Sequence, residues 1–210
     1  MTSTGTPAKA LAARGLRLVL VTLCYNVAEA IVALWAGEAA GSIALVGFGL
    51  DSVIETAASG MLVWRLTREG SGRNPETADR AEGLARRFVG WTFLALAAYV
   101  VVQSVRSLAR GAAAEESVVG MLLAMLSLAV MPLLAWRKWR VAEAMGSAAL
   151  MAEAKETLAC SYLSLCLLAG LALNALLGWW WADPVGAALM VPWLVREGIE
   201  TTSEADASAG

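Results

Sequence analysis

Apolar residues fall into six long runs that are separated by short polar stretches. These runs cover roughly residues 16–36, 42–65, 88–109, 118–136, 152–178 and 182–196. An α-helix of about 20 apolar residues crosses the hydrocarbon core of a bilayer, since each residue adds about 1.5 Å. The pattern therefore predicts an all-α polytopic membrane protein, a bundle of six transmembrane helices.

The segments outside these runs are short. We expect residues 1–15 to form an N-terminal segment and residues 16–196 a single six-helix transmembrane domain. Residues 197–210 are rich in Ser, Ala and Asp and are predicted to be a disordered tail. The longest internal polar stretch, residues 67–87, is predicted to be a loop followed by a short amphipathic lead-in to the third helix.

Composition agrees with a membrane location. Of 210 residues, 59% are hydrophobic and 16% are charged, and the mean hydropathy is +0.63. Soluble domains have about 25% charged residues, and a soluble fold of this length has no core large enough to hide so much apolar surface. The excess is expected to face lipid.

Basic residues gather at alternate ends of the predicted helices. One side of the bundle carries Lys9, Arg14, Arg17, Arg65, Arg68, Arg73, Arg80, Arg86, Arg87, Arg137, Lys138, Arg140 and Arg196. The opposite side carries Arg106 and Arg110. By the positive-inside rule, both termini are predicted to lie in the cytoplasm, with the protein in the cell (inner) membrane.

Asp51 and Glu55 are the strongest functional candidates. They are four residues apart, so both project from one face of the second helix, near the middle of an apolar run. A charged group inside the membrane costs at least about 2.5 kcal/mol. Two like charges one turn apart also repel, unless one is protonated or a cation lies between them. A divalent ion or a shuttled proton would resolve this repulsion; the alternative is a carboxylic acid hydrogen-bonded to a neighbouring helix.

A second pair lies in the fifth helix, where Glu156 and Cys160 are also four residues apart. With Asp51 and Glu55 they would supply four ligands, a number that suits a tetrahedral ion such as zinc. The chain has no histidine, so a metal site must use carboxylate, thiolate and hydroxyl groups. Cys160 could instead be small apolar packing.

Other polar residues within the runs are given supporting roles. Lys155 is expected to pair with Glu153 or a lipid phosphate, or to snorkel toward the membrane surface. Asn26 and Glu29, three residues apart in the first helix, could line an ion pathway or hydrogen-bond to other helices. We favour hydrogen bonding, because no second carboxylate lies one turn away.

The second helix resembles that of the cation diffusion facilitator family. The run from Gly41 to Glu55, Gly-Ser-Ile-Ala-Leu-Val-Gly-Phe-Gly-Leu-Asp-Ser-Val-Ile-Glu, is similar to the family motif in which two acidic residues four apart bind the transported ion. By this resemblance Asp51 matches the first acid, and Glu55 matches the second, where Asp is usual. Residues 182–184, Ala-Asp-Pro, look like the start of the family's sixth helix.

The resemblance allows two registers in the fifth helix. The family has Ala-Asp there, followed three residues later by a His-x-x-x-Asp pair. If residues 152–153, Ala-Glu, take the place of Ala-Asp, then Glu156 stands at the His position and Cys160 at the Asp position. Alignment backward from the sixth helix gives Thr157 and Ser161 instead. The first register is favoured because its residues can ligate a metal.

The resemblance implies a divalent metal cation transporter, usually for zinc, that exchanges metal for protons as a homodimer and so drives efflux from the cytoplasm. The chain looks like a short form without the family's cytoplasmic C-terminal domain. We expect no cofactor beyond the transported cation, no nucleic-acid partner and no enzymatic activity, since neither a Gly-rich phosphate loop nor a nucleophile–base pair is evident. Alternatives are a non-transporting metal-binding or sensing protein on the same bundle, and a structural adaptor.

Overall fold

The computed structural model describes residues 5–68, 75–112 and 114–207, and it is helical throughout these ranges apart from short turns. The six helices are α1 Gly5–Ala40, α2 Ile43–Arg68, α3 Pro75–Arg110, α4 Val118–Met145, α5 Ala148–Leu177 and α6 Ala182–Ala207. The predicted all-α fold with six helices is therefore confirmed. Among the described residues, α1 to α5 each contain a stretch long and apolar enough to cross a membrane.

Several helices extend beyond their predicted ends. The tail predicted to be disordered from residue 197 is instead helical as far as Ala207. Within this extension, Arg196 Nε lies 2.7 Å from Glu200 Oε1, and such pairs one turn apart support a helix. At the other end of the chain, α1 already begins at Gly5, inside the segment expected to precede the bundle.

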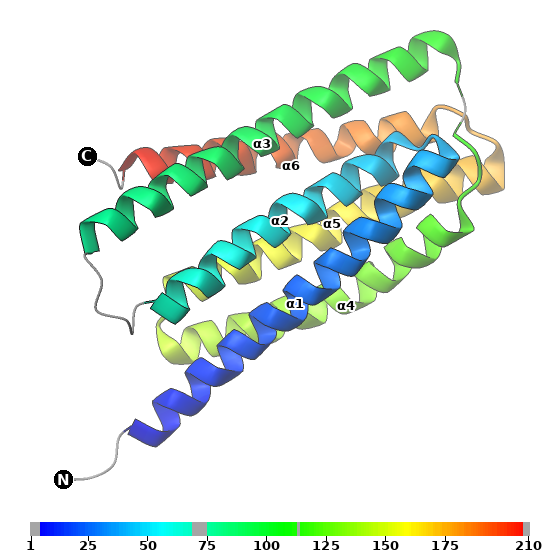
Figure 1. The fold of residues 1–210 in the computed structure, drawn as a ribbon. Helices are drawn as coiled ribbons and strands as arrows, with labels where there is room; N and C mark the ends of the chain where they lie inside the picture. Colours follow the sequence, from blue (N-terminus) through cyan, green and yellow to red (C-terminus); the bar gives the residue numbers. More distant parts are fainter. Residues whose placement is uncertain (1–4, 69–74, 113, 208–210) are drawn as a thin grey trace.

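The helices lie side by side and successive helices run in opposite directions (Figure 1). α3 packs along α6, α4 along α5, and α1 along α2. The first turn of α1 and the last turn of α6 lie at the same end of the bundle, together with the last turn of α2, the first turn of α3 and the α4–α5 connection (Figure 1). We call this the terminal end.

The outer surface of the bundle is apolar. Large apolar side chains are exposed on it, among them Ile31, Trp35, Val105, Leu122 and Leu165. So many exposed large apolar side chains are unusual on a protein that is surrounded by water. The helices therefore have the exterior of a membrane bundle, and several of their polar residues, Asp51 and Glu55 among them, are buried inside it.

Gly146 and Ser147 form the short turn between α4 and α5. Gly146 ends α4 with φ of 62°, a left-handed conformation that a Cβ atom disfavours. Ser147 then accepts a hydrogen bond from the backbone nitrogen of Leu150 and caps α5. This turn holds α5 closely antiparallel to α4.

Asp183, at the start of α6, holds the start of α2. Its Oδ2 accepts a hydrogen bond from the backbone nitrogen of Ile43 at 2.8 Å, and its Oδ1 accepts one from Ser42 Oγ at 2.5 Å. Ser42 Oγ accepts a hydrogen bond from the backbone nitrogen of Leu45 at 3.0 Å. Backbone N–H groups at a helix N-terminus need such acceptors. The helix that carries the two candidate acids is thus fastened to α6.

Candidate metal site

Asp51 and Glu55 of α2 face Cys160 of α5. One ligand atom from each of the three residues lies within 4.8 Å of the other two. Asp51 is 2% exposed, Glu55 8% and Cys160 0%, and Asp51 Oδ2 has no hydrogen-bond partner. We call these three residues the buried cluster. An unpaired carboxylate in such a place is costly unless a proton or a cation neutralises it.

Asn26 and Glu29 of α1 contact the buried cluster. Asn26 Nδ2 donates a hydrogen bond to Glu55 Oε2 at 2.9 Å. Glu29 Oε2 accepts one from Ser52 Oγ at 2.9 Å and a longer one from Cys160 Sγ at 3.8 Å. The expected hydrogen bonds from this pair to other helices are therefore present. Glu29 therefore places a third carboxylate group beside the cluster. Its other oxygen, Oε1, is buried without a hydrogen-bond partner.

The two registers of the fifth helix lead to different surroundings. Cys160 belongs to the buried cluster, and Glu156 lines a cavity together with Glu55. Thr157 Oγ1 instead accepts a hydrogen bond from a lysine of α4 at 2.8 Å, and Ser161 Oγ is buried without a hydrogen-bond partner. In the first register, Cys160 thus lies next to Glu55, and Glu156 lines the same cavity as Glu55.

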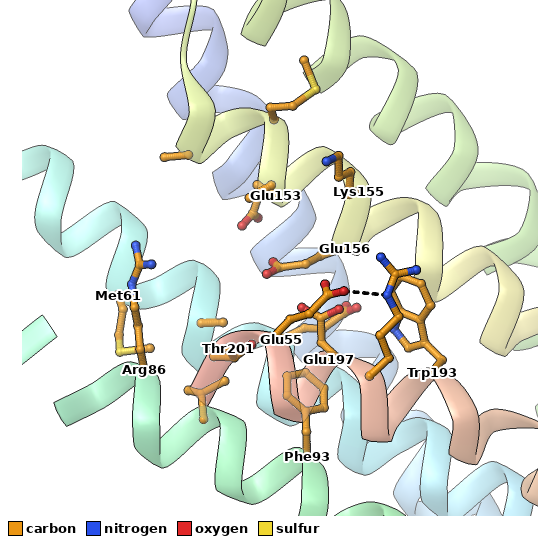
Figure 2. Close-up of a pocket in the computed structure, with 17 residues that line it drawn as sticks. Glu55, Met61, Arg86, Phe93, Glu153, Lys155, Glu156, Trp193, Glu197 and Thr201 are labelled. Atoms are coloured by element: carbon orange, nitrogen blue, oxygen red, sulfur yellow. Dashed lines mark hydrogen bonds and ion pairs between the residues drawn. The ribbon is translucent and has the colours of Figure 1, made fainter. Parts of the chain in front are cut away.

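The cavity has a volume of about 470 Å³ and lies between α2, α5 and the α3–α6 pair. Its lining residues come from the middle of these helices and from their parts nearer the terminal end. Figure 2 shows Glu55, Glu156 and Glu197 gathered inside it, with Phe93 and Trp193 on its apolar wall. Glu55 belongs to both the cavity and the buried cluster, so a cation that enters the cavity meets Glu55 before Asp51.

The chemistry of the buried cluster suits a divalent ion. Two carboxylates attract cations strongly, because charges interact more strongly in the low dielectric of a protein interior than in water. A thiolate adds a preference for softer ions such as zinc or cadmium. Both kinds of ligand must lose a proton to bind metal, so protons and metal compete for them.

Residues 19–205 match a family model described as the cation efflux transmembrane domain. This chain belongs to the cation efflux family. The resemblance to the cation diffusion facilitators is thereby confirmed, and with it a multi-pass membrane protein that transports a cation and is not an enzyme. No curated protein matches the sequence.

In this cation efflux protein, Lys138 and Glu153 form a buried ion pair that sequence reasoning missed. Lys138 Nζ lies 3.0 Å from Glu153 Oε1, and the two side chains are 0% and 5% exposed. The fourth apolar run ends at residue 136, which places Lys138 beyond the predicted span. Instead α4 continues to Met145, and Lys138 is buried within this helix. Lys155 is exposed, which agrees with a side chain that snorkels.

Helical spacing was the signal that could have found Lys138. The buried face of α4 runs through Met131, Leu134, Ala135, Lys138 and Ala142, which follow the helical spacing i, i+3, i+4, i+7 and i+11. Continuing the apolar periodicity of this cation efflux protein past residue 136 puts Lys138 on the inward face. A basic residue on that face requires an acid on a neighbouring helix.

Proposed function

We propose that this protein exports a divalent transition-metal ion, zinc foremost, and that Asp51, Glu55, Glu156 and Cys160 bind it. The observation that carries the proposal is the buried cluster, whose ligand atoms lie within 4.8 Å of one another. Zinc commonly takes four ligands from carboxylate, thiolate and imidazole groups. Three come from the cluster, and Glu156, which lines the same cavity as Glu55, is the proposed fourth.

Proton antiport is the coupling that this ligand set favours. Without a bound metal, neighbouring carboxylates in the membrane interior are stabilised by taking up protons. A metal ion that binds them displaces those protons. A proton gradient directed into the cell can therefore drive metal out, provided that the site opens alternately to the two sides.

The direct test is flux in sealed proteoliposomes that contain a pH-sensitive dye. We expect zinc and cadmium to enter with a matching change of internal pH, and magnesium and calcium to do so poorly. Binding of zinc without flux would instead favour the alternative, a metal-binding or sensing protein on the same bundle. Flux without any pH change would overturn the antiport.

We also propose that both termini face the cytoplasm, as the distribution of basic residues indicates. A cysteine introduced at Ser203, exposed near the end of α6, should react with a membrane-impermeant thiol reagent only in inside-out vesicles. A cysteine at Ala112, exposed between α3 and α4, should react in intact cells. The unsubstituted protein, with its exposed Cys24, measures the background. The reverse pattern would invert the orientation.

A homodimer is a further part of the proposal, and it rests on the family resemblance. Light scattering of the purified protein, with the detergent contribution subtracted, would measure the protein mass. A mass near twice 22.0 kDa is expected, and a mass near that of one chain would contradict the dimer.

A further inference from the structure

Lys138 is a cation buried in the interior of the bundle. It is 0% exposed, and its Nζ contacts Glu153 Oε1 at 3.0 Å and Thr157 Oγ1 at 2.8 Å. A buried ammonium group is costly unless a carboxylate balances its charge. Glu153 supplies that balance, so the pair is neutral as a unit.

Glu153 connects this pair to the metal pathway. Its Oε1 also accepts a hydrogen bond from Ser59 Oγ of α2 at 2.7 Å. Its side chain lines the cavity that Glu55 and Glu156 also line (Figure 2). Glu153 and Glu156 are three residues apart, so they lie on one side of α5. Carboxylate groups from three helices border this cavity, namely Glu55, Glu153, Glu156, Glu197 and Glu200, and Lys138 neutralises Glu153 among them.

Carboxylate groups gathered in this way are able to bind more than one divalent cation. A second ion held at Glu153 would stand on the cavity that leads to Glu55 and would delay passage between the cavity and the buried cluster. Transport requires that binding be weak enough for release. The Lys138 ammonium, 3.0 Å from Glu153 Oε1, already balances the charge that would attract such an ion.

We propose that the Lys138 ammonium takes the place of a second divalent ion at Glu153 and so restricts the acidic pathway to one metal ion. The inference rests on the proposed function, because it takes the buried cluster as the transport site. It makes Lys138 a positioning residue, which acts on the metal through Glu153.

The test is zinc titration of the purified protein by isothermal titration calorimetry, with Lys138→Met, Glu153→Gln and the double variant. We expect one zinc per chain in the wild type and two in Lys138→Met. Glu153→Gln leaves the ammonium unbalanced near the cluster and should weaken zinc binding at least about tenfold. The double variant should again bind one zinc, with an affinity close to that of the wild type.

A merely structural ion pair predicts a different pattern. Both single variants would then lose stability and bind zinc more weakly, whereas the proposal gives them opposite effects on binding. Circular dichroism during heating checks that each variant is folded. If Lys138→Met does not fold, Lys138→Gln, which keeps a hydrogen-bond donor toward Thr157, replaces it.

Lys155→Met is the matched control, because Lys155 lines the same cavity but is exposed. It should bind one zinc. A folded Lys138 variant that binds one zinc, or a double variant that binds two, would overturn the proposal. The proposed function fails separately, if the wild type binds zinc but does not carry it across the proteoliposome membrane.

Discussion

Replacing Asp51 with Asn is expected to lower metal flux at least about 100-fold, equivalent to roughly 2.7 kcal/mol, while the protein still inserts into the membrane. Asn has nearly the shape of Asp but lacks its charge. Asp51 is 2% exposed, and one of its oxygens has no hydrogen-bond partner, so its charge acts where water does not screen it. Flux into proteoliposomes that contain equal amounts of each protein measures the effect.

Glu38→Gln is the control for this prediction. It also removes one carboxylate from the chain, but Glu38 is exposed near the end of α1, away from the terminal end. Its flux should match that of the wild type. A normal rate for Asp51→Asn would place the transport site elsewhere in the bundle.

Replacing Cys160 with Ser is expected to change metal selectivity rather than to abolish transport. Serine is close to cysteine in shape, but it offers a hard oxygen in place of a soft thiolate. Zinc and cadmium binding should fall at least about tenfold, equivalent to roughly 1.4 kcal/mol, and manganese binding should change little. The measurement is competition of each metal against zinc uptake in vesicles.

Two further variants separate the loss of softness from other effects. Cys166→Ser should leave selectivity unchanged, because Cys166 packs within the apolar core. Glu156→Gln should weaken binding of every divalent ion, since it removes charge and not softness. The other register of α5 would be correct if Cys160→Ser leaves the zinc-to-manganese ratio unchanged while Thr157→Val or Ser161→Ala alters it.

The second helix shows how far local sequence carries the argument. Asp51 and Glu55 share a face because they are four residues apart, whatever surrounds them. Six apolar runs long enough to span a bilayer likewise imply a helix bundle without knowledge of its packing. The ends of the helices were less predictable. α6 continues over a polar segment to Ala207, and a polar segment that leaves the membrane has no apolar periodicity to mark it as helical.

The partners of the polar residues depended on tertiary structure. Neighbouring positions on a helix point about 100° apart, so the choice between Cys160 and Ser161 depends on how α5 is rotated against α2. Packing turns Cys160 toward Asp51 and Glu55. In the same way, Glu153 meets Lys138 of α4 because the short turn at Gly146 aligns the two helices. Spacing along the chain therefore determined the membrane spans and the acidic face of α2. The rotation of each helix against its neighbours, which no single segment encodes, decided that Cys160 joins the candidate site and that Lys138 is buried against Glu153.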